Sequence, residues 1–238
     1  MIIKTLILSG FGINCEQETA AAFEQAGSTI HLIELHDFFQ LKSFTNFDII
    51  VFPGGFSYGD EIRSGKILAE QIKSHQLTNL KEFCAQGKLV LGICNGFQVL
   101  VQLGAFADFN QHSFTLKENI QGKFINKWAQ LNLHKNNSPW LKDIGSSLYM
   151  PARHKEGFFY GELKDAQIVL SYKQDLNGSQ KNIAGVCNKN GNILGLMPHP
   201  EAALEDFLFP KDSEKAILNQ QIFKNAVTYA LEQKRKTP

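Results

Sequence analysis

Short apolar runs alternate with helical patterns in the first part of the chain. The apolar runs have the length of strands that are buried on both faces, and they cover residues 5–8, 29–35, 48–52 and 89–93. Between them, apolar positions recur with helical spacing over residues 16–26, 62–73 and 77–85. Because strands that alternate with helices form right-handed βαβ units, this α/β pattern predicts an open, mostly parallel sheet with helices on both faces.

The pattern changes after Gly104. Helical periodicity fades, and short strand-like runs separated by turn signals follow over residues 124–133, 147–151, 168–172, 183–187 and 193–197. The pair Asn190-Gly191 predicts a tight hairpin between the last two runs. No linker composition separates the two halves. We therefore predict a single domain over residues 1–238, with an antiparallel β extension and a closing amphipathic helix over residues 216–233.

Cys94 stands where the fourth apolar run meets a helical pattern. A sharp turn from strand to helix needs small neighbours, and Gly92 and Gly96 give the spacing G-x-C-x-G, the thiol version of the nucleophile elbow. Unpaired N–H groups and the positive end of the helix dipole favour the thiolate there, and the Asn95 N–H is placed to hold an oxyanion. A buried cysteine that only packs is the alternative, and the glycines favour catalysis without deciding it.

Composition narrows the classes of function. The 238 residues carry a formal net charge of +1, which gives no reason to expect a nucleic-acid or membrane partner, and no apolar run approaches transmembrane length. The four cysteines are widely spaced without a C-x-x-C pair, which argues against a zinc site and for a reducing, cytoplasmic location. The motifs at residues 10–15 and 59–66 are incomplete versions of a dinucleotide fingerprint and a P-loop, so we expect no nucleotide phosphate site.

Three other stretches follow predicted strands and can meet Cys94 at one sheet edge. In the first, His199 and Glu201 alternate with prolines, so the carboxylate can orient the imidazole towards a nucleophile. In the second, Gly55 can supply another oxyanion donor, although a plain tight turn is equally compatible. The third, residues 153–158, fits a binding loop or a solvated hairpin. The other histidines before residue 140 lack such a setting: His31, His36, His75, His112 and His134.

Three motifs together resemble the class I glutamine amidotransferases, and most closely the branch of glutaminase subunits of phosphoribosylformylglycinamidine synthase, in purine biosynthesis. They are PGGFSYGD at residues 53–60, LGICNGFQ at 91–98 and MPHPE at 197–201. The resemblance implies a flavodoxin-like fold and a triad of Cys94, His199 and Glu201 that hydrolyses L-glutamine to glutamate and ammonia. It also implies that Gly55 and Asn95 hold the oxyanion and that Gln98 contacts the bound glutamine.

The resemblance further implies partners. Ammonia would pass to a large synthetase subunit that uses ATP and Mg²⁺ to make formylglycinamidine ribonucleotide from formylglycinamide ribonucleotide, and a small third subunit would bridge the two. No cofactor and no metal are expected in this chain. An amidotransferase subunit of another pathway and a DJ-1-like cysteine protein remain as alternatives, although the second would not need His199 and Glu201.

The chain departs from the family pattern at two positions. Lys155 stands where the family usually has glycine, which adds a charge near the expected mouth of the site, and Ala202 replaces an arginine that commonly follows the triad glutamate. We expect both changes to affect the surroundings and not the triad. The remaining cysteines, Cys15, Cys84 and Cys187, are expected to be dispensable for catalysis.

Overall fold

Two sheets form the framework of the molecule. The computed structural model describes residues 1–60, 63–110, 114–210 and 217–236. The strands of the large sheet are β1 (Lys4–Ser9), β2 (Thr29–Glu34), β3 (Ile49–Phe52), β4 (Leu89–Ile93), β6 (Ile125–Leu133), β7 (Ser147–His154), β9 (Ala166–Tyr172), β10 (Ile183–Asn188) and β11 (Ile193–Leu196). Their order across the sheet is β2-β1-β3-β4-β11-β10-β9-β6-β7, and a small sheet pairs β5 (Phe114–Glu118) with β8 (Glu156–Gly161).

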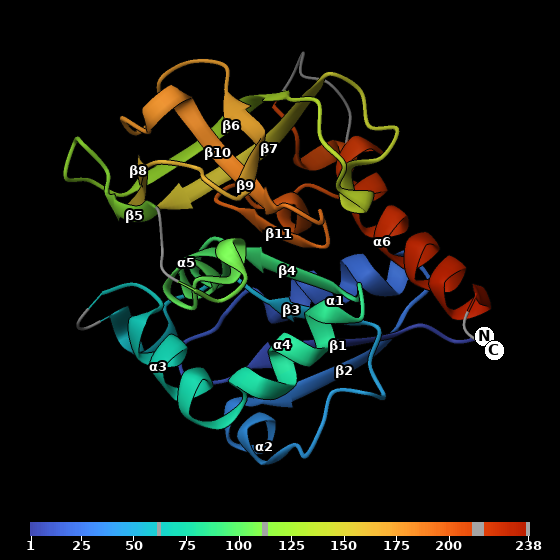
Figure 1. Cartoon of the computed structure of the whole chain (residues 1–238). Helices are drawn as coiled ribbons and strands as arrows, with labels where there is room; N and C mark the ends of the chain where they lie inside the picture. Colours follow the sequence, from blue (N-terminus) through green and yellow to red (C-terminus); the bar gives the residue numbers. More distant parts are fainter. Residues whose placement is uncertain (61–62, 111–113, 211–216, 237–238) are drawn as a thin grey trace.

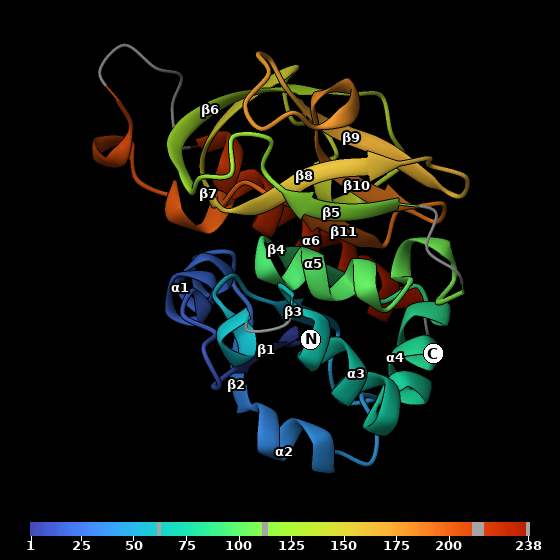
Figure 2. The same cartoon turned by 90° about the vertical axis from the view of Figure 1, so that its left-hand side faces the viewer.

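The first part of the large sheet is parallel, as the sequence predicts. Neighbouring strands from β2 through β1, β3 and β4 to β11 all run in the same direction. The helices are α1 (Glu16–Gln25), α2 (Leu35–Gln40), α3 (Lys66–His75), α4 (Leu77–Ala85), α5 (Asn95–Gln102) and α6 (Ile217–Lys236). Figure 2 shows α1 on one side of β1 and β3, with α3 and α4 on the other, so helices cover both faces.

The predicted antiparallel extension is confirmed. Strands β10, β9, β6 and β7 follow β11 in antiparallel order, and they lie above the α/β part in Figure 1. The hairpin between β10 and β11 is present, with Cys187 opposite Leu194 and with Gly191 at a φ of 78° in the connection. This hairpin turns the chain so that β11 returns to the parallel part of the sheet beside β4.

Several elements differ from the prediction. Helix α2 and the small sheet of β5 and β8 were not predicted, because these segments are short and carry charged residues within them. Residues 153–158, for which a binding loop and a solvated hairpin were both open, form a corner: Lys155 separates β7, in the large sheet, from β8, in the small one. Residues 62 and 216, the predicted first residues of two helices, lie outside the described residues.

The closing helix α6 packs over α1 through aromatic contacts. The ring of Phe23 meets Phe223 edge-on at a centroid distance of 5.1 Å, and Trp140 at 6.4 Å. Near the end of α6, Lys234 Nζ lies 2.8 Å from Asp48 Oδ2, which also accepts a hydrogen bond from the Lys4 N–H at 2.8 Å. No helix within the described residues combines the length and the apolar character needed to cross a membrane.

The turn between β4 and α5 depends on two glycines, as the G-x-C-x-G spacing indicates. A Cβ on Gly96 would overlap the carbonyl oxygen of Phe52 in β3, and a Cβ on Gly92 would lie 2.7 Å from the Gly96 oxygen. In both cases the opposing atom belongs to the backbone, so a side-chain rotation cannot relieve the clash. The close approach of α5 to the sheet therefore requires glycine at these positions.

We predict that Gly96→Ala destabilises the protein by about 1–3 kcal/mol, because overpacking against fixed backbone costs that much. Alanine favours a helix over glycine by about 1 kcal/mol, so the steric cost exceeds the gain. Chemical denaturation of wild type and variant measures the difference. The matched control is Gly145→Ala, where an added Cβ meets nothing within 4 Å. Equal stability of Gly96→Ala and wild type would contradict the packing argument.

Candidate active site

The site lies where neighbouring parallel strands end at one edge of the sheet. Strand β11 pairs with β4 so that Leu196 stands opposite Ile93, and the next residue, Cys94, donates its N–H to the Leu196 oxygen at 2.7 Å. His199 follows β11, and Gly55 follows β3, the other neighbour of β4. Because adjacent strands are about 4.8 Å apart, residues that leave these strands at the same edge come within reach of each other.

Cys94 occupies a strained position between β4 and α5. Its φ of 49° and ψ of −104° lie outside the regions that residues with a side chain normally adopt. The side chain is 7% exposed, and its thiol donates to the Arg153 carbonyl oxygen at 3.5 Å. The residue precedes the first turn of α5, so the thiol lies at the N-terminus of that helix, as the sequence predicts.

His199 and Glu201 form a buried hydrogen-bonded pair. His199 Nδ1 lies 2.6 Å from Glu201 Oε1, and each residue is 3% exposed. The His199 N–H donates to the Pro151 oxygen at 2.8 Å, which fixes the backbone of the loop. Among the described residues, His199 Nε2 has no hydrogen-bond partner, although it is buried. The carboxylate thus holds Nδ1, and Nε2 is the ring nitrogen left for chemistry.

The surroundings of His199 favour its protonated form. Burial by itself lowers the pKa of the imidazole, but the Glu201 carboxylate and the neighbouring thiols of Cys94 and Cys15 together raise it well above the usual 6.5. Cys94 and His199 line the same pocket, and the thiol contributes to the raised pKa of the imidazole. A protonated imidazole beside a thiol stabilises the thiolate form of that thiol.

Cys15 is a second thiol at the same imidazole, and the sequence did not predict it. It lies between β1 and α1. One potential ligand atom of each of Cys15, His199 and Glu201 lies within 4.8 Å of the other two. A Cβ on Gly54 would lie 2.7 Å from His199 Cε1 and 3.1 Å from Cys15 Sγ. Burial raises the pKa of the Cys15 thiol, while the neighbouring His199 imidazole opposes that shift. The feature of the sequence that could have identified Cys15 is its position after the first predicted strand, at the sheet edge where Cys94 and His199 also lie.

The N–H of Gly55 points away from Ile13, the residue that lies opposite it in an isolated antiparallel bridge. Gly55 has a φ of 145° and faces Ile13, with hydrogen bonds from Asn14 N to Gly54 O at 3.2 Å and from Phe56 N to Gly12 O at 2.8 Å. These bonds flank Gly55, whose own N–H has no partner among the described residues. A Cβ at this position would lie 2.6 Å from the Gly12 oxygen, so only glycine fits.

The Asn95 side chain links the elbow to the turn that follows Gly55. Its Oδ1 accepts from the Ser57 N–H at 3.1 Å, and its Nδ2 donates to Asp60 Oδ1 at 3.2 Å and to Gln98 Oε1 at 3.0 Å. The Asn95 N–H lies in the first turn of α5, where backbone N–H groups lack helical partners. The Asn95 amide therefore ties the elbow to the turn that follows Gly55, the other oxyanion donor expected from the sequence.

Gln98 lines the pocket, but its amide is largely engaged by the protein. Its Oε1 accepts from Asn95, and its Nε2 donates to the Glu156 carbonyl oxygen at 2.5 Å. One N–H and one lone pair remain for a ligand. Gln98 thus also holds the β7–β8 corner against α5, a role that the motif alone does not indicate.

The pocket itself is small and has a charged rim. Its volume is about 270 Å³, and the residues that line it include Cys94, His199, Cys15, Gly55 and Gln98. The rim carries both signs of charge, from Glu18, Asp60, Arg153, Lys155 and Glu156. Lys155 pairs with Glu118 at 3.1 Å, but both side chains are more than half exposed, so this ion pair contributes little stability. The mixed charge suits a zwitterionic ligand such as a free amino acid.

A second buried histidine, His154, also lines the pocket; the sequence placed it only within the stretch 153–158 and gave it no role of its own. Its Nδ1 lies 3.1 Å from Asn119 Oδ1 and its Nε2 lies 3.2 Å from the Tyr172 hydroxyl. Burial, and then the positive charge of His199, lower the pKa of His154 to about 3. Burial, and then Cys94, raise the pKa of Tyr172. The side chains of His154 and Tyr172 therefore remain neutral beside the charged pair.

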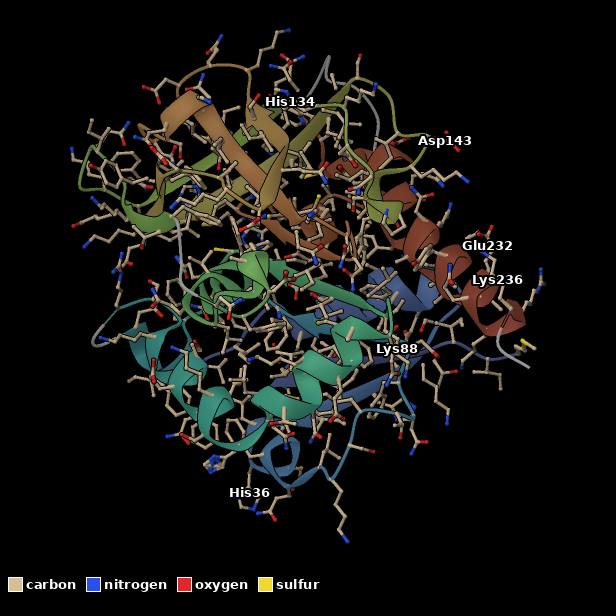
Figure 3. All side chains as sticks on the ribbon, in the orientation of Figure 1. His36, Lys88, His134, Asp143, Glu232 and Lys236 are labelled. Carbon is tan, nitrogen blue, oxygen red and sulfur yellow. The ribbon has the colours of Figure 1, made fainter. Side chains whose placement is uncertain are left out.

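The histidines without a predicted role lie elsewhere. His36 on α2 and His134 after β6 are at opposite ends of the molecule (Figure 3), and His134 Nε2 lies 2.8 Å from Ser171 Oγ. His112 lies outside the described residues. His31 packs against Phe47, and His75 against Phe39. None of these four described histidines lines the pocket with Cys94.

We predict that His154→Gln flattens the dependence of stability on pH below neutrality. An unfolded histidine takes up a proton near pH 6.5, whereas His154 in the folded state does so only near pH 3. Wild type therefore loses about 1.4 kcal/mol of unfolding free energy per pH unit from this group as pH falls across that window. His199 has the opposite sign: its stabilisation is complete below about pH 6.5 and is lost above its raised pKa.

The measurement is the unfolding free energy by denaturant at several pH values between about 6 and 4, for wild type and His154→Gln. The control is His134→Gln, which removes an exposed histidine. Parallel curves for wild type and His154→Gln would refute the assignment of a neutral His154.

Comparisons with known proteins agree with this geometry. The chain matches the CobB/CobQ-like glutamine amidotransferase domain over residues 3–230. The phosphoribosylformylglycinamidine synthase subunit PurQ of Methanococcus maripaludis is 39% identical, over 96% of this chain and 99% of the relative. The PurQ subunit of Thermotoga maritima is 37% identical, over 87% of this chain and 93% of the relative.

Solved structures share the fold. A structure described as PurLQS from Thermotoga maritima has a TM-score of 0.80 at 31% identity, with 96% of this chain and 99% of that chain covered. A glutamine amidotransferase from Thermotoga maritima has a TM-score of 0.63 at 15% identity, over 98% and 99% of the two chains, a likeness that shows the fold alone. The chain therefore belongs to the glutamine amidotransferase family, in the branch of the phosphoribosylformylglycinamidine synthase PurQ subunits.

Proposed function

We propose that this chain is the glutaminase subunit of a phosphoribosylformylglycinamidine synthase and that Cys94, His199 and Glu201 are its catalytic residues. The observation that carries the assignment is the buried His199–Glu201 pair, whose free ring nitrogen serves the pocket that also contains the elbow thiol of Cys94. The substrate is L-glutamine and the products are glutamate and ammonia. The relatives are named as subunits of that synthase.

The proposed reaction has two halves. Cys94 Sγ, as the thiolate, attacks the carbon of the glutamine side-chain amide, and the resulting oxyanion accepts hydrogen bonds from the Gly55 and Asn95 N–H groups. His199 Nε2 gives its proton to the departing nitrogen, which leaves as ammonia. Water then attacks the thioester while His199 takes its proton, and glutamate leaves as the Cys94 thiolate is restored. Glu201 holds Nδ1 throughout and stabilises the imidazolium.

The rest of the pocket is assigned to substrate binding. Gln98 contacts the glutamine through its remaining N–H and lone pair, while its other bonds fix the β7–β8 corner. The charged rim provides partners of both signs for the α-amino and α-carboxylate groups of a free amino acid. A negatively charged group of the substrate would meet Arg153 or Lys155, and a positively charged group would meet Glu18 or Glu156.

The partners follow from the same assignment. The relatives are named as one subunit of a synthase, and a similar solved structure is described as PurLQS. We infer a large synthetase subunit for this chain, with a small bridging subunit as a further candidate. ATP and Mg²⁺ are assigned to the synthetase subunit, and no cofactor to this chain. We also propose a cytoplasmic location, no nucleic-acid or membrane partner, and a single domain over residues 1–238, since one sheet extends from β2 to β7.

We predict that a glutamine-mimicking diazoketone labels Cys94 and not Cys15. Peptide mapping by mass spectrometry after labelling of wild type, Cys94→Ala and Cys15→Ala identifies the nucleophile. We expect Cys94→Ala to take up no label and to lose at least about a thousandfold in glutamine hydrolysis, since a missing nucleophile costs that much or more. Cys15→Ala should still be labelled on Cys94, because the neighbouring thiol is not the nucleophile. An adduct on Cys15 in wild type would overturn the assignment of Cys94.

We predict that the chain supports glutamine-dependent amidine formation when it is mixed with the large synthetase subunit, formylglycinamide ribonucleotide, ATP and Mg²⁺. Activity is measured with the partner present, because partner binding can complete an active site. The matched control is Cys94→Ala, which should abolish the reaction with glutamine but leave the reaction with free ammonia. Glutamine hydrolysis without any amidine would instead assign the chain to another amidotransferase pathway.

A further inference from the structure

One edge of the large sheet faces the active site. β7 is the last strand in the order of the sheet, and three carbonyls on alternate residues of this strand accept hydrogen bonds from outside the sheet. In an antiparallel strand, alternate residues direct their backbone groups to the same side. The three bonds are Asn219 Nδ2 to the Tyr149 oxygen at 3.0 Å, the His199 N–H to the Pro151 oxygen at 2.8 Å and the Cys94 thiol to the Arg153 oxygen at 3.5 Å. The edge of β7 therefore contacts both the loop of His199 and the proposed nucleophile.

The Arg153 carbonyl is held in place by hydrogen bonds around the next residue, His154. Asn119 is 2% exposed, and its Nδ2 donates to the His154 oxygen at 2.8 Å while its Oδ1 lies 3.1 Å from His154 Nδ1. The Tyr172 hydroxyl lies 3.2 Å from the other ring nitrogen. The Asn119 N–H also donates to the Lys155 oxygen at 2.8 Å. Because the Arg153 carbonyl belongs to the peptide unit that it shares with His154, these bonds restrict its rotation.

The position of this carbonyl matters for the substrate, because it lies next to the reacting sulfur. When Cys94 Sγ attacks the side-chain amide of glutamine, the carbon that it attacks carries an oxyanion and a nitrogen. In the proposed reaction the oxyanion accepts hydrogen bonds from the Gly55 and Asn95 N–H groups, and a carbonyl oxygen would repel it. The nitrogen carries N–H donors, so it is the group that a carbonyl beside Sγ can bind.

We propose that the Arg153 carbonyl is a further catalytic group, which accepts an N–H of the substrate amide, and that Asn119 is the residue that positions it. In the resting site the carbonyl accepts the thiol hydrogen of Cys94. Once the thiol is a thiolate, the carbonyl is free for the amide nitrogen and turns the lone pair of that nitrogen towards His199. The carbonyl takes up no proton: His199 still protonates the nitrogen, the carbon–nitrogen bond breaks, and ammonia leaves. This inference rests on the proposed function, because it assigns a role in that reaction.

Two substrates separate this role from a general structural one. L-Glutamine has N–H groups on the part that leaves, whereas the γ-methyl ester of L-glutamate has none. Both substrates share the rest of the amino acid and form the same thioester. The ratio of their kcat/KM values therefore reports on contacts with the leaving group. The ratio is measured for the chain together with the large synthetase subunit, for wild type, Asn119→Ala and Tyr172→Phe.

We expect Asn119→Ala to lower kcat/KM for glutamine by about three- to tenfold more than for the ester, the range that one hydrogen bond contributes. The ester is affected less because its leaving group has no hydrogen to donate to the Arg153 carbonyl. Tyr172→Phe should shift the ratio in the same direction, because it removes the hydroxyl that holds the other side of the His154 ring.

The matched control is Asn192→Ala. Asn192 is 3% exposed, and its Nδ2 donates to the Cys84 and Lys88 oxygens at 3.0 and 2.9 Å. It directly precedes β11, whereas His199 follows that strand, so it lies at the opposite edge of the sheet from the site. This variant also loses two bonds from a buried amide to backbone carbonyls, and its ratio of kcat/KM values should equal that of wild type.

An unchanged ratio in folded Asn119→Ala and Tyr172→Phe would overturn the proposal, and so would an equal fall in Asn192→Ala. Circular dichroism shows whether each variant is folded, and if Asn119→Ala is not, Tyr172→Phe alone decides. Hydrolysis of neither substrate by wild type with the synthetase subunit would refute the proposed function and this role with it. Hydrolysis of both substrates with an unchanged ratio in the variants would refute only the role of the Arg153 carbonyl.

Discussion

The parallel pairing of β4 with β11 is the constraint on which the site depends. Four residue pairs, from Ile193 opposite Val90 to Leu196 opposite Ile93, fix the register of two strands that are remote in sequence. Both strands are buried along their whole length, so a shift in register would expose apolar side chains or move them to the other face. Because the register is fixed, Cys94 and the loop of His199 leave the same edge together. The Cys94 N–H bond to the Leu196 oxygen joins the elbow directly to that strand.

The antiparallel extension has a structural purpose in this arrangement. It carries the chain away from β4 and returns it through the β10–β11 hairpin to the position beside β4. It also supplies the far wall of the pocket, through the corner between β7 and β8. Asn119 holds this corner: its N–H donates to the Lys155 oxygen at 2.8 Å and its Nδ2 to the His154 oxygen at 2.8 Å. The parallel half thus provides the reacting groups, and the extension encloses them.

The two buried histidines show how local partners decide protonation. His199 and His154 are both almost fully buried, which alone lowers the pKa of each. His199 has a carboxylate at 2.6 Å and two thiols nearby, and these partners reverse the effect of burial. His154 has only an amide and a phenol, so it remains neutral. A charged imidazole next to a thiol favours nucleophilic chemistry.

The sequence by itself determined the fold class, the parallel direction of the early strands, the elbow at Cys94 and the pairing of His199 with Glu201. These features follow from local signals: apolar periodicity, glycine spacing, and a histidine and a carboxylate two residues apart. The short helix α2 and the sheet of β5 and β8 were not predicted from the sequence, because short segments with charged residues carry little periodic signal.

Only the tertiary structure decided which remote residues meet. It placed Cys15 beside the His199 imidazole, brought the neutral His154 and Tyr172 next to it, and engaged the Gln98 amide with the β7–β8 corner. None of these contacts has a signal in the local sequence. They depend on the register of strands and on loop geometry, which arise when distant segments pack together and cannot be calculated from the neighbours of a single residue.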